Sequence, residues 1–413
     1  MCTFGGILTE YPWISIDSFL QTNCEVSRVF FISHIHTDHL RGLDQSTFSQ
    51  YITNNRSIRI YCSDTTRHFL SKLSAYKHLA QFYSVLNIDQ PFTIQNPADE
   101  NSSVTVTSCG AGHCPGSLML LFEGSHGTIL YTGDFRLYSH QSKRHRIILS
   151  KKRIDTLYID MTFFEPSIRQ LPERERACEK LIDFIQQYDN QCFYLKTSAR
   201  VGYEYIYISL NQHFGIPIHV HSEQYHLYDC LPQVQRVLTT DGNKTRLHAC
   251  WPKCSHTKSS IKIVLSVLWF TLEQQQQRQF KSPLVQISTD YYRLCYSLHS
   301  SYNEICTFVK QISPTRVHPI ALPDQINSER FNELLKQLGI NQSPIISFAK
   351  SNTQQQIKRR YHHTIENVYN NDTDDELEFD YHENRKTNEK QLFKRISNLQ
   401  LPLTKKCKKD YEK

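Results

Sequence analysis

The chain has 413 residues, 39% of them hydrophobic, and a formal net charge of +7 at pH 7. These values are typical of a soluble, globular protein of two or three domains. The longest apolar stretch, 261–272, is too short to span a bilayer, and no basic segment with an apolar signal core begins the chain. We therefore expect an intracellular protein without a membrane partner. The positive charge is compatible with a polyanionic partner without requiring one.

Cysteine usage points to the same compartment. The 13 cysteines are odd in number and lack the regular spacing of a secreted disulfide framework. We expect most of them to be reduced, and some are candidates for metal binding.

The first third of the chain predicts a sheet-rich domain. Short apolar segments alternate there with turns rich in Gly, Asn, Ser and Asp. The predicted strands are 29–32, 104–108, 118–122, 128–131 and 156–159.

A histidine-rich motif follows the first of these strands. Residues 33–39 read Ser-His-Ile-His-Thr-Asp-His, and a chance HxHxDH is expected on the order of 10⁻³ times in such a chain. Because alternate residues of extended backbone point the same way, His34 and His36 would face one metal ion. Asp38 and His39 follow where the chain should turn into a helix, so they can approach a second ion. The alternative, a solvated His-rich loop, requires neither this spacing nor a preceding buried strand.

Two further motifs could complete a dinuclear site. Residues 111–117 read Ala-Gly-His-Cys-Pro-Gly-Ser, and their glycines would let the backbone pass close to a metal while His113 turns inward. Residues 133–136 read Gly-Asp-Phe-Arg and place Asp134 at a strand end, where its carboxylate can bridge two ions. Either residue alone could be an ordinary buried His or turn Asp. The order of the three motifs makes the joint interpretation specific.

From about residue 172 the pattern changes to helix, strand and helix, which suggests an inserted α/β domain. The predicted elements are a helix at 173–188, a strand at 192–195, a helix at 201–214, strands at 284–287 and 293–298, a helix at 302–312, a strand at 316–320 and a helix at 328–338. After Ser351 the chain is polar and predicts a mostly disordered tail. Its basic clusters at 358–360 and 405–409 are candidates for nuclear import or phosphate contacts, with merely solvated charge as an equal alternative.

The three motifs in this order resemble the metallo-β-lactamase fold in its DNA-processing branch. Residues 157–160 and 298–302 are similar to further motifs of the β-CASP nucleases of interstrand cross-link repair. Within that group, Glu10-Tyr11-Pro12, residues 14–17 and Gly-Tyr-Glu-Tyr at 202–205 look most like the branch that processes ends in non-homologous joining.

The likeness covers roughly residues 1–350 and implies a fold. That fold is an αβ/βα sandwich of two packed sheets flanked by helices, with an inserted β-CASP α/β domain. The metallo-β-lactamase domain would comprise residues 1–162 and 297–350, the β-CASP domain 163–296, and the charged tail 351–413.

The resemblance also implies two sets of metal ligands. One ion would be held by His34, His36, His113 and Asp134, and the other by Asp38, His39, Asp134 and His299. Zinc is expected in a His-rich site, with Mg²⁺ or Mn²⁺ as alternatives at the second position.

Further roles follow from the same resemblance. Asp17 and Asp160 would orient ligand imidazoles from outside the metal centre. The catalytic residues would then be Asp17, Asp38, Asp134, Asp160 and His299. Phosphate or DNA contacts are expected from Thr162, Lys196, Ser297 and Ser300. For Lys196, an exposed lysine at the end of a strand is an equal alternative.

A second metal site is indicated inside the inserted domain. His219, His248, Cys250 and Cys254 offer two imidazoles and two thiolates, the composition of a closed structural zinc centre. The resembled family carries a zinc-finger-like site of this kind, with a more distant cysteine in the place of Cys254. His248 could instead belong to a motif near the active centre; we favour the structural zinc on ligand composition.

The function implied is a metal-dependent DNA endonuclease and 5′-3′ exonuclease. It would process ends, hairpins and overhangs in the nucleus, in double-strand break repair by non-homologous end joining. The alternatives are a 5′ exonuclease of cross-link repair or telomere ends, an RNA-cleaving β-CASP enzyme, a small-molecule hydrolase and a non-catalytic scaffold. The large insert argues against the small-molecule hydrolase, and the full set of ligands argues against the scaffold. The long regulatory tail of the resembled branch is absent here, which puts partnership with the DNA-dependent protein kinase and the ligase complex in doubt.

Overall fold

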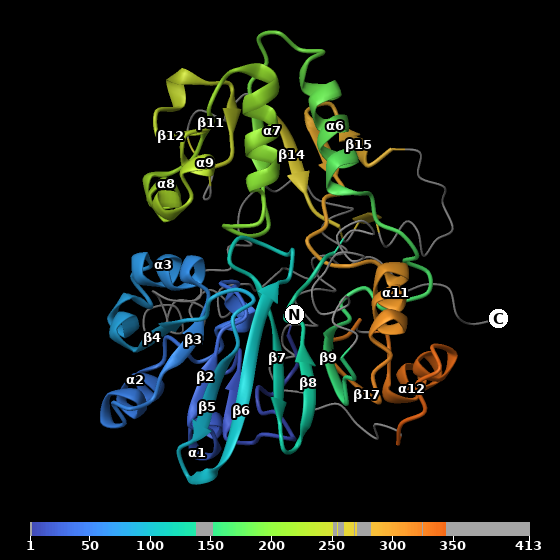
Figure 1. The fold of residues 1–413 in the computed structure, drawn as a ribbon. Coiled ribbons are helices and arrows are strands. Elements are labelled where there is room, and N and C mark those ends of the chain that lie inside the picture. Colours follow the sequence, from blue (N-terminus) through green and yellow to red (C-terminus); the bar gives the residue numbers. More distant parts are fainter. Residues whose placement is uncertain are drawn as a thin grey trace, which may run out of the picture. The chain divides into compact units, whose positions relative to one another are not determined.

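The computed structural model describes residues 2–137, 152–250, 254, 260–267, 269–270, 282–323 and 325–343. The internal contacts divide the chain into Met1–Lys350 and Ser351–Lys413, and every described residue belongs to the first unit. The predicted tail, with its two basic clusters, lies outside the described residues. Three sheets organise the first unit (Figure 1).

The first sheet is parallel and is built from the N-terminal residues. Its strands, in spatial order, are β1 (Ile14–Ile16), β2 (Val29–Phe31), β3 (Ile60–Cys62) and β4 (Tyr83–Val85). The connections hold the helices α1 (Gln21–Val26), η1 (Thr37–His39), α2 (Ser46–Asn54), α3 (Asp64–Lys72) and η2 (Lys77–Phe82). Parallel strands require such crossovers, and the helices bury Phe48 and Phe69 in one cluster with Phe30 and Ile60.

The second sheet has six strands in the order β17-β9-β8-β7-β6-β5. Their bounds are β5 (Phe92–Asn96), β6 (Asp99–Gly110), β7 (Leu118–Gly124), β8 (Gly127–Tyr131), β9 (Thr156–Asp160) and β17 (Arg316–Ala321). The helices α11 (Tyr302–Ile312) and α12 (Ser328–Gln337) cover one face, where Phe308 and Phe331 pack in one cluster with Leu130.

The two sheets pack face to face. Ile14, Ile16 and Phe31 of the first sheet share a buried cluster with Leu120 and Phe122 of the second. Because helices pack against the other face of each sheet, the layers are helix, sheet, sheet and helix. This confirms the predicted αβ/βα sandwich.

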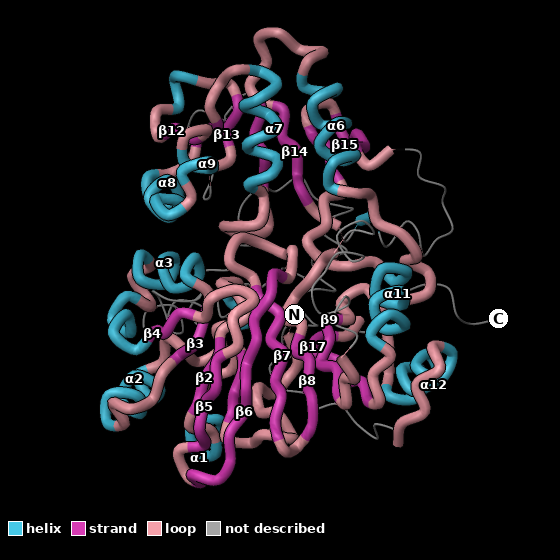
Figure 2. The backbone as a smooth tube through the Cα atoms, viewed as in Figure 1, coloured by secondary structure: helices cyan, strands magenta, loops and turns pink. Residues whose placement is uncertain are grey.

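The third sheet belongs to the α/β insert (Figure 2). Its order is β12-β11-β13-β10-β14-β16-β15, with bounds β10 (Phe193–Lys196), β11 (Ile218–His219), β12 (Leu238–Thr239), β13 (Leu247–His248), β14 (Ile261–Leu265), β15 (Leu284–Ser288) and β16 (Tyr291–Leu294). The accompanying helices are α6 (Arg174–Ile185), α7 (Glu204–Phe214), α8 (Ser222–Leu227), η3 (Tyr228–Cys230), α9 (Pro232–Gln235) and η4 (Gly242–Lys244). The predicted domain boundaries at 162/163 and 296/297 stay a prediction.

Several predicted elements have different bounds in the structure, and two of these differences concern the backbone near the candidate site. The helix expected at 201–214 begins only at Glu204, because Gly202 has φ +114°, which is not helical. The strand expected at 293–298 is β16, which ends at Leu294 and is followed by irregular backbone. Both differences occur where the chain approaches the candidate site. Among the described residues, no helix combines the length and the apolar character needed to cross a bilayer.

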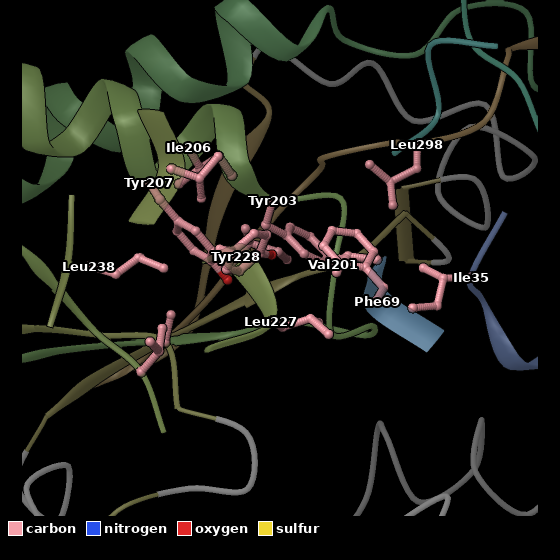
Figure 3. Packing of buried hydrophobic residues seen from close by; sticks show 14 of the residues in the cluster. Ile35, Phe69, Val201, Tyr203, Ile206, Tyr207, Leu227, Tyr228, Leu238 and Leu298 are labelled. Carbon is pink, nitrogen blue, oxygen red and sulfur yellow. The ribbon is translucent and has the colours of Figure 1, made fainter. Parts of the chain in front are cut away.

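One buried cluster joins the insert to the first sheet's helical side. Ile35 and Phe69 share it with Val201, Tyr203 and Tyr228 of the insert (Figure 3). The rings of Phe69 and Tyr228 pack edge to face, with their centroids 6.0 Å apart. This shared packing fixes the insert against the loop that carries the HxHxDH motif.

Candidate metal centre and active site

The predicted ligands follow strand ends that meet at one edge of the sandwich. Asp17 follows β1 and residues 33–39 follow the neighbouring parallel strand β2, with Ile16 paired to Phe31. Asp134 follows β8, and Asp160 ends β9, which is parallel to β8. The amide of Leu118 donates to the carbonyl of Ser33 at 2.9 Å, which ties the two sheets together at this edge. Parallel pairing therefore brings side chains far apart in sequence to one place.

The first predicted ligand set is gathered in space. His34, His36, His113 and Asp134 each offer a ligand atom, and these atoms lie within 4.8 Å of one another. Nε2 of His34 and Nε2 of His113 are each 3.6 Å from Oδ2 of Asp134. Nδ1 of His36 is 2.9 Å from Nε2 of His113. Three nitrogens and a carboxylate thus face a common point.

The second predicted set lies around the same carboxylate. Oδ1 of Asp134 is 3.2 Å from Nε2 of His39, whereas its Oδ2 is 3.8 Å from Nε2 of His299. Oδ2 of Asp38 is 3.8 Å from Nε2 of His39. Oδ2 of Asp134 therefore lies near His299 as well as near His34 and His113, and Oδ1 lies near His39. The one carboxylate thus lies beside imidazoles of both predicted ligand sets, where it could bridge two ions.

A partner orients the outer nitrogen of each imidazole in the centre. The five pairs are His34 Nδ1 with Ser33 Oγ (3.0 Å), His36 Nε2 with the Val201 carbonyl (3.1 Å), His39 Nδ1 with Asp17 (2.8 Å), His113 Nδ1 with the Leu298 carbonyl (3.0 Å) and His299 Nδ1 with Asp160 (2.8 Å). Such partners fix ring orientation and tautomer in metal sites. Asp17 and Asp160 thus have the positions expected of orienting carboxylates.

Asp17 is itself held firmly. Its carboxylate accepts hydrogen bonds from the Ser33 amide (2.7 Å), the Ser33 hydroxyl (2.6 Å) and the Tyr131 hydroxyl (2.8 Å). Its φ is +58°, in the left-handed region that few residues other than glycine adopt. These hydrogen bonds hold Asp17 in the strained conformation, and in that position its carboxylate directs Nε2 of His39 into the cluster.

The chemistry of the donor set fits divalent metal ions. Nε2 of His34 and Nε2 of His39 are buried and make no hydrogen bond to any described residue. Unpartnered buried nitrogens are costly unless a ligand satisfies them. Burial and the neighbouring imidazoles hold the pKa values of His34 and His113 well below the ordinary value, so both rings are neutral, as metal ligands must be. These clusters imply that the site binds divalent metal.

The predicted phosphate contacts fall into two groups. Lys196 is exposed at the end of β10, and Thr162 donates from its amide and hydroxyl to Asp160. The hydroxyls of Ser297 and Ser300 are buried and donate to the carbonyls of His299 and Phe135, at 2.8 and 2.9 Å. Both serines therefore shape the loop that carries His299, and their contact with phosphate stays a prediction.

Two arginines that the sequence did not single out for a role also hold this loop. Arg136 is fully buried and donates to the carbonyls of Ser297 (3.0 Å) and Pro172 (3.0 Å). Arg174 of α6 donates to the carbonyls of Ser297 (3.1 Å) and Gly112 (2.9 Å). Arg136 lies inside the Gly-Asp-Phe-Arg motif, which was a usable signal. Arg174 lies in an unremarkable helical stretch and gave none.

A separate cluster forms in the insert. His219 and His248 are cross-strand partners on β11 and β13, and their Nδ1 atoms are 2.9 Å apart. Sγ of Cys250 is 3.1 Å from Nδ1 of His219, and Sγ of Cys254 is 3.7 and 3.8 Å from the two histidine nitrogens. Tetrahedral zinc with two nitrogens and two sulfurs separates its ligand atoms by about 3.3–3.8 Å. The four predicted residues are thus grouped at nearly the spacing of such a site.

Comparison with known proteins finds similarity to metallo-β-lactamase proteins of DNA repair. Residues 232–325 match the family described as DNA repair metallo-beta-lactamase, and residues 16–170 match the anti-Pycsar protein Apyc1 family. Protein artemis of Mus musculus is 32% identical over 366 residues, which cover 82% of this chain and 51% of that protein. Protein artemis of Danio rerio is 35% identical over 367 residues, which cover 82% of this chain and 56% of that protein. The 5′ exonuclease Apollo of Gallus gallus is 32% identical over 321 residues, which cover 78% of this chain and 64% of that protein.

The chain thus spans about half the length of the artemis proteins that it matches. The two family matches, at residues 16–170 and 232–325, together include every predicted metal ligand of the strand-end cluster. The chain belongs to the DNA repair metallo-β-lactamase family, in its artemis-like β-CASP branch.

Proposed function

We propose that this chain is a metal-dependent DNA nuclease that processes DNA ends, including hairpins and overhangs, in double-strand break repair by non-homologous end joining in the nucleus. The observation that carries the proposal is the position of Asp134, whose carboxylate lies beside imidazoles of both proposed ligand sets. Two ions sharing a carboxylate suit in-line attack on a phosphodiester. Zinc is the proposed ion, with Mg²⁺ or Mn²⁺ as alternatives on the side of Asp38 and His39.

The chain's own residues hold and orient this chemistry. His34, His36 and His113 would hold one ion, Asp38, His39 and His299 the other, and Asp134 both. Ions bound there would lower the pKa of water and neutralise the charge that develops on the phosphodiester. Asp17 and Asp160 keep the rings of His39 and His299 fixed, so little reorganisation accompanies the reaction.

DNA contacts are proposed for Lys196 and Thr162. Lys196 is exposed at the end of β10, where its ammonium could meet a phosphate. Thr162 lies beside the metal centre, because its hydroxyl donates at 2.6 Å to Asp160, the partner of His299. Partnership with the DNA-dependent protein kinase and a ligase complex has no support in the described residues, so the proposal does not depend on it.

The cluster in the insert is proposed as a structural zinc site. Its four side chains complete a tetrahedral set and leave no position for a substrate, unlike a catalytic zinc site. His248 contacts His219 and Cys254 within this cluster, which supports this role over one in the active centre.

A 5′ exonuclease is the second candidate. The similarity to Apollo of Gallus gallus, whose name describes it as a 5′ exonuclease, favours it. The two activities differ in their products. We would incubate the purified chain with end-labelled DNA carrying hairpins, overhangs or 5′-phosphorylated single strands, and with matched RNA. Internal cleavage at hairpins and overhangs supports the proposal, stepwise shortening from the 5′ end alone supports the exonuclease, and cleavage of RNA alone contradicts both.

A further inference from the structure

The insert contacts the metal centre directly through a backbone carbonyl. Nε2 of His36 lies 3.1 Å from the carbonyl oxygen of Val201, a residue 165 positions along the chain. The other nitrogen, Nδ1, is 2.9 Å from Nε2 of His113 in the ligand cluster. Nδ1 therefore faces the metal position, and Nε2 carries the proton that it donates to Val201. That carbonyl fixes both the tautomer and the rotation of the ring.

A carbonyl in a loop can orient a ligand only if the loop itself is held. The amide of Gly202, the next residue, donates to both carboxylate oxygens of Glu204, at 2.9 and 3.0 Å. The hydroxyl of Tyr228 donates to Oε1 of the same carboxylate at 2.6 Å. Glu204 thus closes a short ring of hydrogen bonds immediately after Val201, at the first residue of α7.

The surroundings leave this loop little freedom. Glu204 is only 7% exposed, and burying a carboxylate is costly unless donors surround it, as they do here. A Cβ on Gly202 would lie 2.5 Å from Cδ1 of Leu298, the residue whose carbonyl faces Nδ1 of His113. The ring of Tyr228 packs against Phe69 of α3 (Figure 3). Val201 and Leu298, whose carbonyls face His36 and His113, therefore belong to one buried cluster.

We infer that Glu204 is a positioning residue of the metal centre: from the insert, with Tyr228, it holds the Val201 carbonyl against His36 and so sets the geometry of one metal position. The inference rests on the proposed function only in taking His36 as a metal ligand. It assigns the insert a part in assembling the metal site, in addition to any part in holding DNA.

The test measures metal binding by the full chain without DNA. Glu204→Ala, Glu204→Gln, Tyr228→Phe and His36→Ala would be loaded with Co²⁺, and affinity measured by competition with a chelator alongside the visible absorption spectrum. The matched control is Glu179→Ala, which removes an exposed glutamate from the neighbouring helix α6. His36→Ala identifies the spectral component that belongs to its own metal position and separates it from the cysteine-containing cluster.

We expect Glu204→Ala to lower the Co²⁺ affinity of the metal position identified by His36→Ala by about 10-fold or more. This is the usual cost of losing an outer partner of a metal ligand. Glu204→Gln should retain part of the affinity, because its amide oxygen can still accept from Gly202. Tyr228→Phe keeps the packed ring and should show a smaller loss of the same component. Unchanged affinity and spectrum in a folded Glu204→Ala would overturn the inference. If that variant does not fold, an unchanged component in Tyr228→Phe overturns it instead. Failure to cleave DNA would count against the proposed function alone.

Discussion

Nδ1 of His39 lies 2.8 Å from a carboxylate oxygen of Asp17, and this contact turns the opposite nitrogen of the ring toward Asp134. The pair joins the residue after β1 to the last residue of η1 and places a carboxylate directly behind a proposed metal ligand. A carboxylate in this position raises the basicity of the imidazole and fixes its tautomer.

Replacing Asp17 by Asn should therefore weaken one metal position without unfolding the chain. Asn tolerates the left-handed φ of +58° found here, whereas Ala would add backbone strain. We expect the affinity for the ion at His39 to fall by about 10- to 100-fold. Metal content after dialysis and the thermal unfolding curve would be measured together. Full metal content in Asp17→Asn would show that the carboxylate has no orienting role.

Substituting ligands of the strand-end cluster should remove its metal without removing zinc from the cluster in the insert. In the double variant His36→Ala with Asp134→Ala, we expect about one zinc per chain to remain, held by the cluster around His219 and Cys250. Adding Cys250→Ser should remove that zinc and lower the melting temperature, because a structural zinc contributes to folding. The measurement is zinc content by elemental analysis. A chain emptied of zinc by the double variant alone would contradict the structural site.

Glu10 gives a prediction about pH. Burial acts to raise the pKa of Glu10. Hydrogen bonds to its carboxylate lower the pKa by more than burial raises it, so the pKa lies below the ordinary value; the donors include Thr156, Tyr158 and Thr9. Because the folded pKa is depressed, the stabilisation is complete above the ordinary glutamate pKa and is lost as the pH falls through the folded value. Glu10→Gln should cost on the order of 1–3 kcal/mol near neutral pH.

Urea unfolding of Glu10→Gln and the natural chain at several pH values tests this. Their difference in unfolding free energy should shrink below about pH 4, where glutamate begins to protonate. Glu100→Gln, on the exposed part of β6, is the control and should show little difference at any pH. A difference for Glu10→Gln that grew as the pH fell would contradict the depressed pKa.

Gly202 should tolerate no side chain. Its φ of +114° is open only to glycine, and a Cβ would lie 2.5 Å from Leu298. Gly202→Ala should lower the free energy of unfolding by about 1–3 kcal/mol or more. Gly5→Ala is the matched control, because nothing lies within 4 Å of a Cβ built there. Equal unfolding curves for the two variants would show that the loop adapts.

The sequence predicted the ligand cluster because its signals are local. The HxHxDH spacing, and a His and an Asp that follow apolar strands, identify side chains by residue type. The orienting roles of Val201 and Leu298 were not predictable, because they act through backbone carbonyls that carry no mark in the sequence. The irregular backbone before α7 includes Val201, and the irregular backbone after β16 includes Leu298, so both differences in bounds lie at these carbonyls. Ser297 and Ser300 show the converse: the segment was identified, but their hydroxyls point into the protein.

The most direct test of a nuclease built on this metal centre is cleavage of a 5′-labelled DNA with a single-stranded overhang. The natural chain, Asp38→Ala and the control Asp64→Ala would be compared at equal concentration with added zinc, Mg²⁺ or Mn²⁺. Asp64 is 66% exposed and pairs with Arg67 on α3, so its loss should leave cleavage intact. We expect cleavage by the natural chain and the control, and a loss of at least about 100-fold in Asp38→Ala. Cleavage that survives in Asp38→Ala would contradict the two-metal account.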